Sequence, residues 1–286
     1  MGVGWTFVGG LDYHPDEHGG TTGRGRLQNQ GGHMTVLRSR RNALRLAVAT
    51  LVAMAVALTF TAPAGRPGHG PAIWHPPVQH LWNGTSLNWA GYDAVTGPYT
   101  EVSANWTQPS VSCAAGETSY SSFWAGLDGG ASGDGTVEQT GTDADCSGGT
   151  PVYYAWYEMY PKYPVNLNAP VRPGDSMAGV VVTSGNGVFQ LAISDRTQGW
   201  TSQVSQHLHQ ATLQTAEVIA EAPSSRAGVL ALADFGTVSF SASLTDNAPL
   251  GDANPVQLVM VSGNTVKAQP SALSGGQDFS VTWEHS

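Results

Sequence analysis

Alternation of apolar and polar residues with a period of two is the feature that most constrains the fold of this chain. The pattern runs through residues 102–106, 238–244 and 279–283. Glycine, asparagine, aspartate and proline separate such stretches, as at 184–187 and 262–264, and these residue types form the turns between strands. Long stretches of helical periodicity are missing. The sequence therefore predicts an all-β fold, an antiparallel sandwich or barrel.

The first 64 residues differ in kind from the rest of the chain. Met34 begins a stretch with four arginines, and an apolar run over 46–60 and the small residues of 62–64 follow. This order of basic, apolar and small residues predicts a secretory signal peptide over 34–64. The apolar run is shorter than the roughly 20 residues that a retained membrane anchor needs. Because a signal peptide works from the N-terminus, residues 1–33 are interpreted as lying upstream of the true start, with a polar leader as the alternative.

The remainder divides into a short segment and one domain. Residues 65–81 are rich in proline and glycine and are predicted to be a linker or a short pro-segment. Residues 82–286 contain no second linker, and about 200 residues suit a single sandwich domain. The two cysteines, Cys113 and Cys146, form an even count that favours a disulfide in an exported protein, and two buried thiols are the alternative.

Acidic residues strongly outnumber basic ones after the predicted signal peptide. From residue 65 onward, six Lys and Arg stand against 18 Asp and Glu, a balance of −12. Nucleic acid and anionic membrane surfaces would repel such a domain, so neither is expected as a partner. Acid would neutralise most of this charge. The composition is therefore compatible with work at low pH. With the predicted signal peptide, the mature protein is expected to be secreted and extracellular, and a monomer is expected.

Three strand-like segments place polar side chains on one face, where a plain apolar core would not have them. Alternate residues of a strand share a face. By this rule the shared faces are formed by Gln139 with Asp143, by Trp156 with Glu158 and Tyr160, and by Glu217 with Ile219 and Glu221. Buried carboxylates are costly unless paired or protonated, so each segment taken singly could instead face solvent. A carboxylate between two aromatic rings, as at Glu158, favours a cleft for an extended or ring-shaped ligand.

Other catalytic arrangements find little support. The sequence contains no G-x-S-x-G nucleophile motif and no H-E-x-x-H zinc motif. His207 and His209 share a strand face, but no third zinc ligand can be named, so neither a metal nor a cofactor is predicted. A two-aspartate protease would show D-T-G, whereas residues 139–141 read Gln-Thr-Gly.

Seven short segments follow one another in a recognisable order. They are NWAG at 88–91, VSANWTQP at 102–109, FWAGLDG at 123–129, EQTGTD at 138–143, AWYEMYP at 155–161, AEVIAE at 216–221 and ADFG at 233–236. In these segments the chain resembles the glutamic peptidases, or eqolisins, which are secreted acid proteases of fungi and some bacteria. The resemblance implies a bacterial secreted member whose fold is a lectin-like (concanavalin-like) jelly roll of two seven-stranded antiparallel sheets.

The resemblance also implies residue roles. The catalytic pair would be Gln139 and Glu221, with Glu221 as general base and then acid on a water and Gln139 stabilising the oxyanion. The substrate-binding residues implied by the resemblance are Trp124, Asp128, Asp143, Trp156, Glu158 and Tyr160. Met159 and Val218 replace tryptophans of the family, and by parity both point away from the site face. A Glu221 pKa near the ordinary value of about 4.3 would give an acidic pH optimum. Because the resemblance is not to the aspartic proteases, we also expect an endopeptidase that pepstatin does not inhibit.

Two alternatives to a peptidase remain open at this level. The first is a lectin-like glycoside hydrolase that uses Glu158 and Glu221 as its paired carboxylates, with aromatic side chains stacked on sugar rings. Such an enzyme has no need of Gln139, whereas the peptidase depends on it. The second is a non-catalytic sandwich that binds peptides or carbohydrates.

Overall fold

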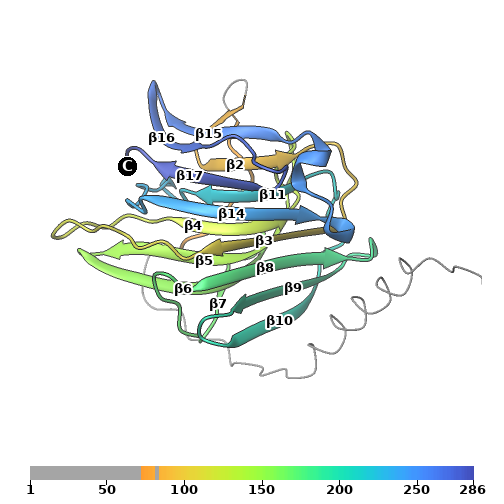
Figure 1. Ribbon diagram of the computed structural model, residues 1–286, viewed down its shortest axis with the longest axis horizontal. Helices are drawn as coiled ribbons and strands as arrows, with labels where there is room; N and C mark the ends of the chain where they lie inside the picture. The colour runs from red at the N-terminus through yellow and green to blue at the C-terminus, as the bar shows by residue number, and fades with distance from the viewer. Residues whose placement is uncertain (1–71, 81–83) are drawn as a thin grey trace, which may run out of the picture. The chain divides into compact units, whose positions relative to one another are not determined.

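The structure, a computed structural model, describes residues 72–80 and 84–286. The predicted signal peptide and the residues before it lie outside these ranges. Short strands connected by turns make up almost all of the described residues, together with two 3-10 turns (Figure 1). None of the described residues belongs to a helix long and apolar enough to cross a membrane.

The strands follow the alternating segments of the sequence. Their bounds are β1 Thr85–Ser86, β2 Trp89–Ala94, β3 Glu101–Thr107, β4 Ser122–Leu127, β5 Val137–Ser147, β6 Thr150–Tyr160, β7 Val165–Asn166, β8 Ser176–Thr183, β9 Val188–Asp195, β10 Trp200–His207, β11 Ala216–Glu221, β12 Ser224–Ser225, β13 Gly228–Val229, β14 Thr237–Leu244, β15 Val256–Ser262, β16 Thr265–Pro270 and β17 Asp278–Trp283. The 3-10 turns are η1 Thr245–Asn247 and η2 Leu250–Ala253.

The strands form two layers that are continuous at one edge. One layer has the order β10-β9-β8-β3-β14-β17-β16, and the other has the order β2-β11-β4-β5-β6-β7. Strand β15 pairs with β16 through its second half and with β2 through its first half, so it belongs to both layers. The predicted antiparallel sandwich is confirmed, and the two sheets are joined through β15. The short β1 pairs with β15 in parallel.

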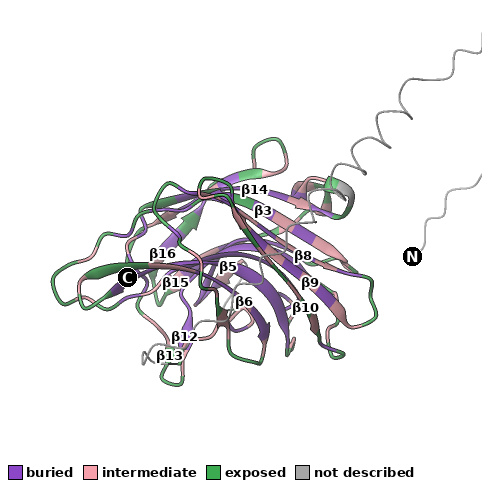
Figure 2. Ribbon diagram, turned by 90° about the horizontal axis from the view of Figure 1, so that it is seen from below, coloured by how far each residue is buried: buried purple, intermediate pink, exposed green. Residues whose placement is uncertain are grey.

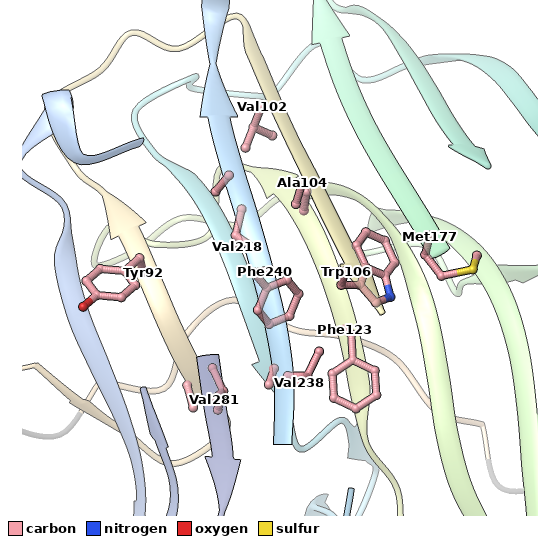
Figure 3. Packing of buried hydrophobic residues seen from close by; sticks show 14 of the residues in the cluster. Tyr92, Val102, Ala104, Trp106, Phe123, Met177, Val218, Val238, Phe240 and Val281 are labelled. Atoms are coloured by element: carbon pink, nitrogen blue, oxygen red, sulfur yellow. The ribbon is translucent and has the colours of Figure 1, made fainter. Parts of the chain in front are cut away.

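The main hydrophobic core lies between the two layers. Figure 3 shows side chains from both layers pointing toward one another, among them Phe123 and Val218 from one layer and Trp106 and Phe240 from the other. Each is at most 3% exposed. The indole N–H of Trp106 also donates across the layers to Thr142 Oγ1 at 3.0 Å. Burial of a large apolar side chain stabilises a fold by about 1.5–3 kcal/mol, so this core is the main source of stability.

The two layers differ in how far their outer faces are buried (Figure 2). In β8 and β9 buried residues alternate regularly with half-buried ones, as expected for a sheet with one face toward water. In β2, β4 and β11 every residue is buried. The second face of this layer therefore is covered as well, and this face carries the polar residues that the sequence singled out.

The two cysteines form the expected disulfide. Cys113 and Cys146 are bonded, with their Cα atoms 5.6 Å apart. The bond ties the loop before β4 to the far end of β5. It closes a loop with a sequence separation of 33 residues, for which chain entropy predicts about 3–4 kcal/mol of stabilisation.

Candidate active site

The face of β2, β4, β5, β6 and β11 that points away from the main core is called the polar face below. Strand register sets its layout. Gln139 on β5 lies opposite Glu158 on β6, and Glu221 on β11 lies opposite Ser122 on β4. Ser122 in turn pairs with Asp143. Because neighbouring strands bring directly opposite side chains to about 5 Å, residues far apart in sequence become neighbours on this face.

Parity assigns the intervening residues to the two faces as predicted. Trp124, Trp156 and Tyr160 belong to a second, smaller apolar cluster on the polar face. Met159 and Val218 instead belong to the main core, which confirms that these two departures from the family point away from the site. The alternative in which the polar segments face solvent is wrong.

Gln139 and Glu158 form the first hydrogen-bonded pair on the polar face. The Gln139 amide Nε2 donates to Glu158 Oε2 at 3.1 Å, and both side chains are fully buried. Burial raises the pKa of Glu158 well above its usual range, and the nearby carboxylates of Glu221 and Asp143 raise it further.

Glu221 is held by an indole. Trp124 Nε1 donates to Glu221 Oε2 at 2.9 Å, while Glu221 Oε1 makes no hydrogen bond among the described residues. Gly141 allows this arrangement, since a Cβ at Gly141 would lie 2.5 Å from the Cβ of Trp124. The small residue therefore leaves room for the Trp124 side chain directly opposite it on β4.

The pKa of Glu221 is higher in the structure than the sequence predicted. The sequence predicted an ordinary value, but burial raises the pKa of Glu221 well above that range, and the Trp124 hydrogen bond opposes the shift only in part. The physical reason is that the side chain is fully buried. An alternation pattern reports which face a residue is on and does not report whether that face is covered.

Asp143 is paired with Trp156 along the same face. Trp156 Nε1 donates to Asp143 Oδ1 at 2.6 Å. Burial raises the pKa of Asp143 to about 6, against the opposing hydrogen bonds of Tyr154, Ser122 and Trp156. Tyr160, at the end of β6, is half-buried and packs against the edge of the same apolar cluster.

Asp128 is oriented differently from the other residues that the resemblance implied. It follows β4 with a left-handed φ of 62°. Its carboxylate accepts hydrogen bonds from the backbone N–H groups of 212, 213 and 214 and from the hydroxyl of Thr212, at 2.7–2.9 Å. It thus anchors the loop before β11, whereas Gln139, Asp143, Glu158 and Glu221 lie together with the tryptophans.

His75 is a member of the site that sequence reasoning missed. It lies in the proline-rich segment, yet it is 1% exposed and sits against the polar face. Its carbonyl oxygen accepts a hydrogen bond from Gln139 Nε2 at 2.8 Å. A signal existed in the neighbouring Ile73 and Trp74, which are large apolar residues in a segment otherwise read as a solvated linker.

Together these features define a class. The structure is an antiparallel β-sandwich with a buried cluster of carboxyl groups, indoles and the Gln139 amide, and this amide donates to a peptide carbonyl. Comparison with known proteins assigns the family. The Peptidase A4 family model matches residues 87–283, and the chain therefore belongs to this family.

Individual relatives agree with the assignment. Aspergillopepsin-2 of Aspergillus niger is 31% identical over 178 residues, a match that spans 54% of this chain and 63% of aspergillopepsin-2. The structure of scytalido-glutamic peptidase with a transition state analog inhibitor has a TM-score of 0.61 at 22% identity and covers 69% of this chain and 98% of its own. Aspergilloglutamic peptidase from Aspergillus niger has a TM-score of 0.52 at 25% identity, with 58% and 99% covered.

Proposed function

We propose that this chain is a secreted acid endopeptidase that hydrolyses peptide bonds with Gln139 and Glu221. One observation carries the proposal: the Gln139 amide donates at 2.8 Å to the carbonyl oxygen of a peptide bond on the polar face. An amide in that position can also donate to the oxyanion that forms when this carbonyl is attacked. Family membership supports the same activity.

The proposed reaction uses one carboxyl group twice. Ionised Glu221 takes a proton from a water molecule, and the water oxygen bonds to the scissile carbonyl carbon. Gln139 Nε2 stabilises the negative oxygen of the resulting tetrahedral intermediate. Glu221 then passes its proton to the leaving nitrogen, the carbon–nitrogen bond breaks, and a carboxyl and an amine product are released. Glu221 Oε1 and Gln139 Oε1 make no hydrogen bond among the described residues, so both can accept from the water.

The state of Glu221 links this reaction to the accessibility of the site. A general base must be ionised, whereas complete burial favours the protonated acid and raises the pKa of Glu221. Contact with water would reverse that shift and return the carboxyl toward its ordinary pKa near 4. The proposed reaction therefore requires a polar face open to substrate and solvent, and acid conditions would then suit it.

The neighbouring side chains would bind and orient the substrate. Trp124 holds Glu221, and Glu158 holds the amide of Gln139. Trp156 and Tyr160 offer ring surfaces to an extended protein or peptide substrate. Asp128 would act on substrate only through the loop that it anchors. Export from the cell and a bacterial source stay predictions.

A digestion experiment tests the proposal. The full chain is incubated at pH 3–4 and then given an acid-denatured protein, with and without pepstatin. We expect cleavage that pepstatin does not block, because no aspartate pair is involved. Cleavage that pepstatin abolishes would contradict the Gln–Glu mechanism, and complete inertness toward peptides after opening of the site would favour a binding protein.

A further inference from the structure

Residues 74–78 cross the polar face and are attached at both ends. Trp74 exchanges two backbone hydrogen bonds with Ser224, at 3.1 and 3.0 Å, and its ring meets that of Tyr163 edge-on. At the other end, the N–H of Val78 donates to the carbonyl of Gly129 at 3.0 Å. The stretch between these anchors lies over the site and bends at Pro77. It is therefore held there as a bound peptide would be.

The imidazole of His75 is fully matched by its surroundings. Nδ1 lies 2.9 Å from Glu158 Oε2, and Nε2 lies 3.1 Å from Ser122 Oγ. The ring stacks on Trp156, with centroids 3.9 Å apart and planes inclined by 3°. Asp143 Oδ1 approaches Nε2 at 3.9 Å. Both nitrogens and one ring face thus have partners.

These contacts select for one kind of side chain. A phenylalanine ring could stack on Trp156, but it would remove the imidazole partner of Ser122 Oγ and one of the three nitrogen partners of Glu158 Oε2. Leaving buried polar groups unpaired weakens an interaction by about 10- to 100-fold. An alanine would lose the stacking as well. The set formed by Ser122, Trp156 and Glu158, called the imidazole site below, therefore favours histidine.

The backbone of the same residue is held as a substrate would be. The N–H of His75 donates to Glu158 Oε2 at 3.0 Å, and its carbonyl accepts from Gln139 Nε2 at 2.8 Å. The bond after this carbonyl leads to Pro76, which is itself buried. Proline lacks an N–H, and its ring fills the place beside the leaving nitrogen. The carbonyl thus occupies the donor, while the bond next to it is a poor one to cut.

We propose that residues 74–78 are an internal, substrate-like ligand, and that the imidazole site is a subsite selective for histidine at the residue whose carbonyl Gln139 holds. The segment keeps substrate out until it leaves the polar face. The direction of the chemistry rests on the proposed function, whereas the binding of the segment and the selectivity do not.

The first test compares three forms of the full chain on an acid-denatured protein substrate. His75→Ala removes the imidazole, and Gln79→Ala is the matched control, because its contacts with Asn88 and Leu87 use backbone atoms. We expect the initial rate of His75→Ala to exceed that of the wild type by about ten-fold or more, with Gln79→Ala close to the wild type. Equal rates in all three forms, with activity present, would overturn the internal-ligand proposal.

The second test measures binding and needs no catalysis. The peptide Ala-Ile-Trp-His-Pro-Pro-Val-Gln, which copies residues 72–79, is titrated calorimetrically into the His75→Ala chain, beside versions with phenylalanine or alanine at the histidine position. We expect the histidine peptide to bind about 10- to 100-fold more tightly than either version, and the wild-type chain to bind it more weakly than His75→Ala.

The outcomes separate this proposal from the proposed function. Selective binding without cleavage by any form would leave the subsite standing and remove the peptidase. Cleavage together with equal affinity for the three peptides would keep the peptidase and overturn the subsite. Absence of binding by all three, in a chain that a melting curve shows to be folded, would overturn the internal ligand.

Discussion

Two ends of the polar face are equally buried and yet differ in whether their carboxyl groups accept hydrogen bonds. Around the candidate site, Glu158 and Glu221 each accept hydrogen bonds from neighbouring N–H groups. At the other end Asp93 and Glu217 lie directly opposite each other on β2 and β11, and neither oxygen of either group makes a hydrogen bond among the described residues. At the first end, N–H groups donate hydrogen bonds to the carboxyl groups. At the second end, two carboxyl groups lie opposite each other without such donors.

This difference indicates two separate uses of buried acid. Burial raises the pKa of Asp93 to about 7. It raises that of Glu138, which alternation places on the other face of β5 and whose oxygens also make no such hydrogen bond, to about 9. Two carboxyl groups side by side are compatible with folding when at least one keeps its proton. Asp93 and Glu217 therefore tie stability to acid conditions, as the raised pKa values of Glu158 and Glu221 also do. Under the proposed function, the donors around Glu221 orient that group for chemistry as well.

The largest expected effect comes from removing the amide donor at the first end. In the His75→Ala chain, where the covering segment does not limit the rate, Gln139→Ala should lower kcat/KM by about 10²–10³, equivalent to about 2.7–4 kcal/mol of transition-state stabilisation. Gln190→Ala, on strand β9 of the other layer, is the control. Loss of activity in both variants, or in neither, would contradict a specific role of the Gln139 amide in the reaction.

A smaller effect should follow from Asp128→Asn. The neutral amide keeps the left-handed backbone conformation but accepts the four hydrogen bonds of the 212–214 loop less well. We expect a loss of about 2–3 kcal/mol in unfolding free energy, measured by denaturant titration, with little change in KM. A raised KM with unchanged stability would instead return Asp128 to the substrate-binding residues.

The pH dependence of the unfolding free energy tests the part of the comparison that concerns the buried acids Asp93 and Glu138. The folded pKa values of Asp93 and Glu138 lie above their unfolded values, so the folded state binds more protons. The stabilisation is complete below about pH 4 and is lost as pH rises through about 7 for Asp93 and about 9 for Glu138. Each group contributes a slope of up to about 1.4 kcal/mol per pH unit. Denaturant titrations from pH 3 to 8 should show this decline, and a flat profile would contradict it.

Strand parity predicted most of the polar face because it is a local rule. Within each strand it grouped Gln139 with Asp143, Glu158 with its flanking aromatic residues, and Glu221 with Glu217. It also placed Met159 on the opposite face of its strand, since each residue lies in a regular strand. Parity made no assignment for Asp128, whose backbone turns into the left-handed region after β4. Alternation of faces applies only to regular strands and therefore predicts nothing for a proline-rich segment. The position of His75 is set by tertiary contacts alone.

The raised pKa of Glu221 was unpredictable for a related reason. A pKa follows from total burial, which is the sum of contacts from several distant strands and from whatever covers the face. The continuity of the two sheets through β15 has the same origin, because one strand pairs with β16 and β2 along different parts of its length. Such features depend on the whole fold and not on a local pattern.

We expect the two ends of the polar face to do different work, and variants of β11 provide the most direct measurement. Glu221→Gln and Glu217→Gln are identical changes on one face of one strand. Cleavage of a denatured protein at pH 4 and unfolding at pH 7 are measured for both in the His75→Ala chain. The account predicts that Glu221→Gln loses cleavage while still folded, and that Glu217→Gln still cuts and is more stable at pH 7. Full cleavage by Glu221→Gln, or loss of cleavage by folded Glu217→Gln, would contradict it.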